Sequence, residues 1–218
     1  MFIGHYAVGF AAKKVVPKVS LGTLFLAVQL PDLIWPILML LGVEHVRIDP
    51  GNTAFSPLDF IDYPISHGLV TSLGWSVALG LIYFLVMKYP KGAWVVGAGV
   101  FSHWVLDFIT HRADLPLSPG SSQYVGLGLW NYYLWSVVVE GTLFLAGVII
   151  YSRYTGAKDK TGRYAYWSLV GFLGLVWTMN VAGPPPPNVE AVGYSALLLW
   201  LLVPWGCWIE RHRSPVIS

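Results

Sequence analysis

Seven ionisable side chains lie within or beside apolar stretches of this sequence, where a charge is costly unless it is paired or bound to a metal. They are His5, Asp32, His67, His103, Asp107, His111 and Glu140. Six of the seven are histidine or aspartate, whose nitrogen and oxygen atoms bind divalent metals when they are clustered. The pattern therefore predicts a metal site inside an apolar protein.

The clearest local signal is a segment in which His103, Asp107 and His111 follow one another at intervals of four residues. On a helix, this spacing places the three side chains on one stripe. A carboxylate one turn from an imidazole can bind the same metal, or it can orient the imidazole through its second nitrogen. We expect His103 and Asp107 to be ligands, with His111 at the outer end of the stripe.

Asp32 and His67 occur in contexts that fit the same site. Asp32 lies between Pro31 and Pro36, and prolines in mid-span break the helical ladder, which is tolerated where the helix lines a cavity. An ordinary kink, with Asp32 bonded to a neighbouring helix, is the alternative. His67 begins a span, where an interfacial histidine is the alternative interpretation, as it is for His5.

The composition determines what kind of protein must hold these residues. The chain has 218 residues, 56% apolar and 11% charged, with a mean hydropathy of +0.61, whereas a soluble domain has about 25% charged residues. A soluble domain and a disordered chain are therefore excluded. The single cysteine, Cys207, disfavours a disulfide scaffold. A net charge of +2 without a dense basic cluster argues against a nucleic-acid partner. We expect an integral membrane protein in contact with membrane lipids.

Six stretches are long and apolar enough to be membrane helices, which need about 20 residues each. They are 19–43, 67–87, 92–109, 133–151, 164–182 and 193–209. A shorter stretch, 2–12, predicts a half-helix that dips into the bilayer. The sequence predicts one all-α membrane domain over residues 1–218, with a metal-site half in 1–111 and a motif-poor half in 133–209.

Lysine and arginine are distributed unevenly between the connecting loops. Eleven of the 13 lie on one side of the predicted spans, and only Arg47 and Arg112 lie on the other. Because basic loops stay in the cytoplasm, we expect a multi-pass protein of the cytoplasmic membrane with both termini in the cytoplasm. At about 1.5 Å per residue, the site residues then fall near the middle of the bilayer or toward its outer face. The predicted site opens outward.

The order of the motifs resembles a known family. The motifs that carry the resemblance are, in chain order, His5, Pro31-Asp32, Ser66-His67 and the His-x3-Asp pair His103 and Asp107. They resemble the predicted membrane-bound metal-dependent hydrolases of bacterial inner membranes and are more distantly similar to zinc-dependent phospholipase C. The resemblance covers residues 1–111, with Pro-Ile-Ser-His-Gly where the family usually carries Arg-Gly and Thr-His-Ser. It implies an inner-membrane enzyme that hydrolyses phosphodiesters.

The donor types favour Zn²⁺, as one ion or two, because imidazole nitrogens and carboxylate oxygens occur without a nearby cysteine. The expected ligands are His5, Asp32, His67, His103 and Asp107. A metal would lower the pKa of its water toward about 7, with Asp32 or His111 as general acid or base. This chemistry near mid-bilayer predicts cleavage of a lipid, lipid-linked or amphiphilic phosphoester. Arg112, and with less reason Arg47, could contact its phosphate.

Two other classes of protein fit the same residues. A proton or divalent-metal transporter or channel would need a continuous polar path, but the half of each span nearest the basic loops is almost free of ionisable groups. A non-catalytic scaffold would use the residues only to pair helices. Glu140 has two alternative roles, a proton relay or a buried neutral acid. No motif in the sequence indicates the oligomeric state.

Overall fold

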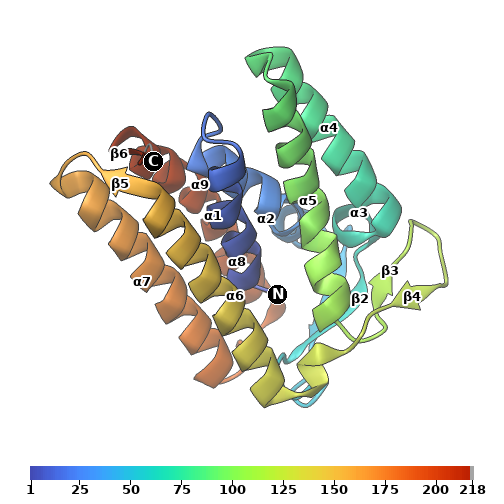
Figure 1. Cartoon of the computed structure of the whole chain (residues 1–218). Helices are drawn as coiled ribbons and strands as arrows, with labels where there is room; N and C mark the ends of the chain where they lie inside the picture. Colours follow the sequence, from blue (N-terminus) through green and yellow to red (C-terminus); the bar gives the residue numbers. More distant parts are fainter. Residues whose placement is uncertain (217–218) are drawn as a thin grey trace.

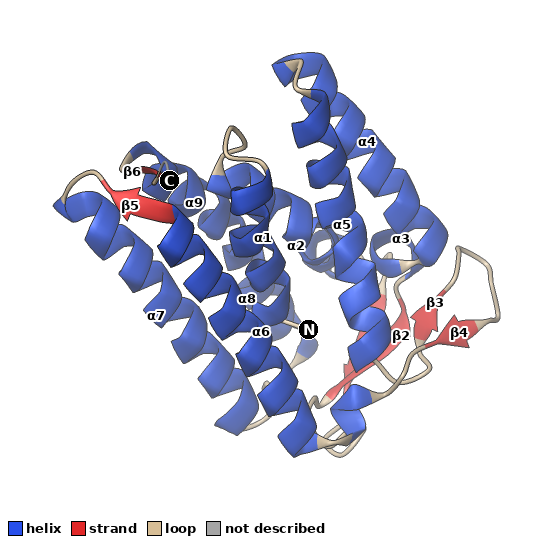
Figure 2. Cartoon of the chain, viewed as in Figure 1, coloured by secondary structure: helices blue, strands red, loops and turns tan. Residues whose placement is uncertain are grey.

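The computed structural model describes residues 1–216, and it is 69% helical (Figures 1 and 2). Among these residues, six helical segments are long and apolar enough to cross a membrane. They are α2 (Leu21–Leu40), α4 (Leu69–Met87), α5 (Pro90–Thr110), α6 (Tyr133–Tyr154), α7 (Lys160–Ala182) and the segment Val189–Arg211. The all-α class and the six predicted spans are confirmed.

The last span is divided into α8 (Val189–Leu197), the 3₁₀ helix η2 (Leu198–Leu201) and α9 (Leu202–Arg211). Pro204 explains the change, because its ring clashes with the carbonyl four residues earlier and it has no amide hydrogen to donate. The chain accommodates the proline by tightening into 3₁₀ geometry just before it. The two prolines of α2 have a milder effect, since that helix continues through both.

The predicted half-helix is α1 (Ile3–Val15), which is too short to cross a bilayer. It lies at the centre of the molecule, packed against α2, α5 and α6 (Figure 1). Its contact with α6 depends on Gly147, where a Cβ would lie 2.6 Å from the backbone of Ala7. Tyr6 and Phe10 of α1 are buried and meet Phe25 of α2 edge to face. The packing of α1 therefore fixes the position of His5.

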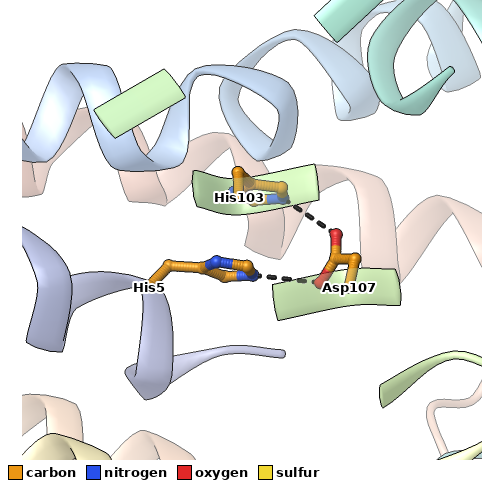
Figure 3. A group of neighbouring side chains, drawn as sticks. All are labelled: His5, His103 and Asp107. Carbon is orange, nitrogen blue, oxygen red and sulfur yellow. Dashed lines mark ion pairs between the residues drawn. The ribbon is translucent and has the colours of Figure 1, made fainter. Parts of the chain in front are cut away.

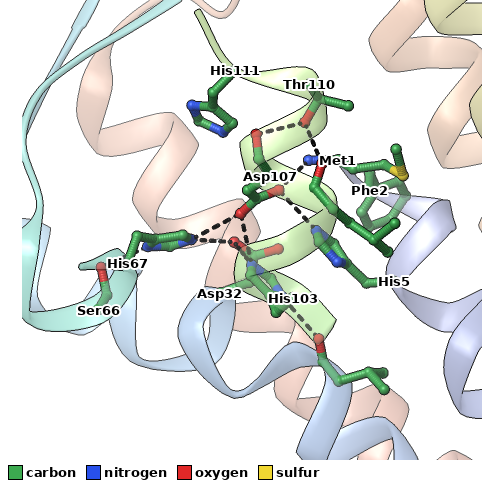
Figure 4. A network of polar contacts seen from close by, with 12 residues as sticks. Met1, Phe2, His5, Asp32, Ser66, His67, His103, Asp107, Thr110 and His111 are labelled. Atoms are coloured by element: carbon green, nitrogen blue, oxygen red, sulfur yellow. Dashed lines mark hydrogen bonds and ion pairs between the residues drawn. The ribbon is translucent and has the colours of Figure 1, made fainter. Parts of the chain in front are cut away.

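The helical bundle has two chemically different ends. The basic end comprises the α1–α2 connection, the α4–α5 and α6–α7 turns and the residues after α9. It includes one antiparallel strand pair, β5 (Thr155–Ala157) with β6 (Arg213–Pro215). It carries the eleven basic residues that the sequence places on one side. Met1, in contrast, lies in mid-bundle beside Asp107 (Figures 1 and 4), although the sequence predicts both termini at the basic end.

The opposite end, which we call the ribbon end, carries short extended segments that the sequence does not predict. They are the antiparallel pairs β1 (His45–Ile48) with β2 (Leu58–Asp62) and β3 (Leu115–Pro116) with β4 (Tyr124–Val125), followed by η1 (Leu129–Asn131). Between β2 and α4, a single helical turn, α3 (Pro64–His67), turns the chain back into the bundle. The ribbon end therefore delivers His67 to the interior.

Candidate metal centre

Five side chains from four helices converge inside the bundle (Figure 4). They are His5 from α1, Asp32 from α2, His67 from α3, and His103 and Asp107 from α5. These are the five ligands that the sequence predicts. They form two groups that share His103, one with His5 and Asp107 and one with Asp32 and His67, and within each group the ligand atoms lie within 4.8 Å of one another.

Asp107 lies at the centre of the five (Figures 3 and 4). Its Oδ1 is 3.2 Å from Nε2 of His5, and its Oδ2 is 3.1 Å from Nε2 of His103 and 3.7 Å from Nε2 of His67. Asp32 Oδ1 closes the group at 3.4 Å from His67 Nε2 and 3.7 Å from His103 Nε2. Ligands around one tetrahedral zinc lie about 3.3 Å apart when each is about 2.0 Å from the ion. The observed separations therefore fit a divalent cation.

Two ring nitrogens that face Asp107 have no hydrogen-bond partner of their own. Nε2 of His5 and Nε2 of His103 are buried and accept or donate no hydrogen bond within the described residues. Their rings stack in parallel with centroids 3.7 Å apart, so both nitrogens face Asp107 (Figure 3). Two buried nitrogens without hydrogen bonds would be costly in an apolar interior. A cation that accepts their lone pairs removes this cost.

A hydrogen bond at the opposite ring nitrogen fixes the tautomer of His103. Its Nδ1 is 2.8 Å from the backbone carbonyl oxygen of Val28. Because a carbonyl can only accept, Nδ1 carries the hydrogen, and the lone pair of the neutral ring is left on Nε2. Val28 belongs to α2, the helix that also carries Asp32. This helix therefore supplies one candidate ligand, Asp32, and orients a second, His103.

His67 is oriented by a chain of two hydrogen bonds. Its Nδ1 is 2.7 Å from Oγ of Ser66, and Ser66 Oγ donates to Oε2 of Glu44 at 2.6 Å. Glu44 also accepts from the amides of Ile65 and Ser66, both at 2.8 Å. Glu44 directly follows the predicted span 19–43 and would be expected in a solvated loop, but its side chain is buried. Its role could be suspected only from the adjacency of Ser66 and His67.

Access to the cluster differs between its members. The side chain of Asp32 is 24% exposed, whereas those of His67 and Asp107 are 4% and 2% exposed. The site is therefore reached at Asp32. Toward the basic end, the interdigitated rings of Tyr6 and Phe25 lie between the cluster and the surface.

His111 does not join the five ligands. Helix α5 ends at Thr110, and His111 has extended backbone angles (φ −65°, ψ 148°), so the helical stripe holds only His103 and Asp107. The ring turns toward the ribbon end, where its Nδ1 is 3.1 Å from Asp114 Oδ1 and 3.2 Å from the hydroxyl of Tyr63. Burial, together with the Asp114 carboxylate, raises the pKa of the Tyr63 phenol well above its usual range, so Tyr63 keeps its hydrogen.

The two arginines of the ribbon end share one carboxylate. Arg112 pairs with Oδ1 of Asp59 and Arg47 pairs with Oδ2. Arg112 also donates from Nε to Asp114 at 3.1 Å, which links the arginines to His111. Both remain partly exposed, at 40% for Arg112 and 62% for Arg47, so each retains donors for a further anion.

Glu140 contacts none of the five ligands and instead caps α1. Its Oε1 accepts from the backbone amides of Phe2 and Gly4, and its Oε2 accepts from the indole nitrogen of Trp177 at 3.1 Å. A carboxylate at the first turn also complements the helix dipole. Glu140 thereby fixes the start of α1 and, through it, His5.

No family model, no curated protein and no solved structure matches this chain. The resemblance to membrane-bound metal-dependent hydrolases therefore stays a prediction that rests on the motifs in residues 1–111. The arrangement of the five ligands is the basis on which a function can be assigned.

Proposed function

We propose that this protein is an integral membrane metal-dependent hydrolase that cleaves a phosphoester of a lipid, lipid-linked or other amphiphilic substrate. The observation that carries the proposal is the convergence of three imidazole nitrogens and two carboxylates inside the bundle. This donor set favours Zn²⁺ over harder cations, which prefer oxygen ligands alone. The five residues can hold one ion, or two ions that divide the ligands between them, with His103 serving only one because its Nε2 has a single lone pair.

Each residue has a role that follows from its surroundings. When bound, the metal supplies Lewis acidity, which activates a water and polarises a phosphoryl oxygen. His103 and His67 present Nε2 because Val28 and Ser66 hold their other nitrogens. Asp32 is the most exposed of the five, so it is the carboxylate best placed to take a proton from water that enters the site.

Residues of the ribbon end extend this machinery outward. His111 follows the last turn of α5 after Asp107, and Asp114 orients its ring. We assign His111 as the second candidate for proton transfer, toward the leaving group. Arg112, linked to His111 through Asp114, is the candidate contact for a substrate phosphate.

The setting favours a substrate that partitions into the membrane. The faces of α4 and α6 that point away from the bundle are apolar, with Val77 69% exposed and Leu145 60% exposed. We propose that these faces contact lipid and that the basic end faces the cytoplasm of a bacterial inner membrane. A lipid head group would reach the ligands at Asp32, the most exposed of the five.

A transporter of protons or divalent metals is the second candidate, because buried Asp and His residues also serve such proteins. The arrangement supports it less well. Buried aromatic rings of α1 and α2 lie between the ligands and the basic end, which argues against a continuous polar path across the bundle.

The test combines metal analysis with an activity assay. Protein purified in detergent without chelator should contain stoichiometric zinc and should hydrolyse a phospholipid. His103→Ala and Asp107→Asn should lose both properties, while the control His45→Ala, at an exposed position of β1, should keep them. Protein that carries no stoichiometric metal would overturn the proposal. Metal uptake into vesicles without hydrolysis would favour the transporter.

A further inference from the structure

Lys14 and Arg153 line one hollow at the basic end, between α1 and α6. Its volume is about 250 Å³, and Ile149, Ile150 and Tyr154 complete the lining. The hollow lies away from the metal centre, because α1 runs from His5 outward to Lys14. It plays no part in the proposed hydrolysis.

The basic residues around this hollow differ in how far their charge is used. Lys13 is buried and donates to two backbone carbonyls and to Glu210. Arg213 is buried against Tyr166 and donates to backbone and side-chain oxygens of Thr155. Lys14 and Arg153, in contrast, are exposed, and within residues 1–216 neither forms an ion pair.

The acidic residues of the basic end do not compensate these two cations. Glu210 is paired with Lys13, and Asp159 accepts from His212 at 2.7 Å. The hydrogen bond from His212, with one from the amide of Gly162, lowers the pKa of Asp159. Both carboxylates are thus already engaged. The hollow carries two positive charges that attract an anion from outside the bundle.

The wall of the hollow is apolar and faces outward. Ile149 and Ile150 belong to span α6 and are 49% and 36% exposed. A cationic rim beside an apolar wall suits a molecule that is anionic at one end and hydrocarbon along its length. Another hollow of this end, which Lys18 lines, offers one cation, and that cation lies over the ring of Tyr89.

We propose that the hollow binds an anionic phospholipid of the adjacent leaflet. The phosphate lies between Lys14 and Arg153, whose guanidinium can donate two parallel hydrogen bonds to it. An acyl chain lies along Ile149 and Ile150. Basic pockets between membrane helices bind anionic head groups in this manner.

The experiment titrates the full chain in detergent with phosphatidylglycerol or phosphatidylcholine and counts bound lipids by native mass spectrometry. We expect phosphatidylglycerol to bind more tightly than phosphatidylcholine. The double variant Lys14→Gln/Arg153→Gln should weaken phosphatidylglycerol binding by about tenfold or more and leave phosphatidylcholine unchanged. A matched double variant, Lys160→Gln/Arg163→Gln, removes the same charge from exposed positions of α7 and should retain binding.

Three results would overturn the proposal. Equal binding of the two lipids would show that the rim does not recognise charge. Equal losses in both double variants would show attraction to the whole basic end rather than to this hollow. Inorganic phosphate that binds as tightly as phosphatidylglycerol would show that the apolar wall contributes nothing. Thermal unfolding midpoints of the two double variants should match that of the wild type, so a loss of binding is not a loss of fold.

Discussion

The hydroxyl oxygen of Ser66 lies 2.7 Å from Nδ1 of His67 and must accept the imidazole hydrogen, because its own hydrogen is donated to Glu44. A buried carboxylate thus determines, through a serine, which nitrogen of His67 faces the cluster. This is the arrangement in which outer partners of a ligating histidine fix its tautomer and orientation.

Replacing this serine should weaken metal binding without removing a ligand. Ser66→Ala leaves Nδ1 of His67 and one oxygen of Glu44 without their partner, and loss of such an outer partner typically costs about 10–100-fold in affinity. Zinc affinity measured by competition with a chelator checks this. Ser72→Ala, at a buried serine whose hydroxyl has no partner within the described residues, should leave the affinity unchanged. An equal loss in both variants would contradict the role of Ser66.

Metal removal should destabilise the protein, because the buried Nε2 atoms of His5 and His103 would then lose the ion that accepts their lone pairs. An ion that binds only the folded state at 100 times its Kd adds about 2.7 kcal/mol. The thermal unfolding midpoint should therefore fall on treatment with chelator and recover with zinc. In His103→Ala the midpoint should be insensitive to both treatments. A zinc-dependent midpoint that survives in His103→Ala would place the ion elsewhere.

Glu140 should behave as a positioning residue. Glu140→Ala leaves the amides of Phe2 and Gly4 and the indole of Trp177 unpaired, and a buried unpaired donor costs about 1–3 kcal/mol. The unfolding midpoint and the zinc affinity should both fall. Glu140→Gln keeps an acceptor oxygen for the start of α1 and should restore most of the affinity. A proton relay would be lost in the glutamine variant too, so hydrolysis that fails in Glu140→Gln with normal metal content would contradict positioning.

The close contact of α1 with α6 should tolerate no added methyl group. Gly147→Ala places a Cβ 2.6 Å from the backbone of Ala7, and overpacking of this kind costs about 1–3 kcal/mol. Gly141→Ala on the same helix meets only the Trp177 ring, at 3.5 Å. We expect the first variant to lower the unfolding midpoint and the second to leave it near the wild-type value. Equal midpoints would mean that α1 shifts freely.

The sequence predicts the helical spans, and it singles out the five side chains that converge in the bundle, for a physical reason. Apolar length alone identifies a membrane helix, and a carboxylate or imidazole within such a helix is too costly to be incidental. Asp32, His103 and Asp107 stand out on this ground, and the structure brings all three together.

What the sequence does not predict depends on where the chain turns. His111 leaves the stripe because α5 ends one residue earlier, and the exact end of a helix is set by backbone partners rather than by spacing. Glu44 directly follows a predicted span, where a solvated loop is expected, yet the ribbon end folds back and buries it against Ser66. Contacts of this kind join segments that are distant in the sequence, and the spacing of apolar residues within one segment does not predict them.

The shortness of α1 bears on the order in which the protein is assembled during synthesis. A helix of 13 residues cannot cross a bilayer unaided, and α6, which receives it at Gly147, emerges from the ribosome much later. Until α5 enters, the nascent chain holds His5, Asp32 and His67 without His103 and Asp107. The proposed metal site is therefore complete only once α5 has been synthesised, and α1 reaches its close contact at Gly147 only when α6 follows.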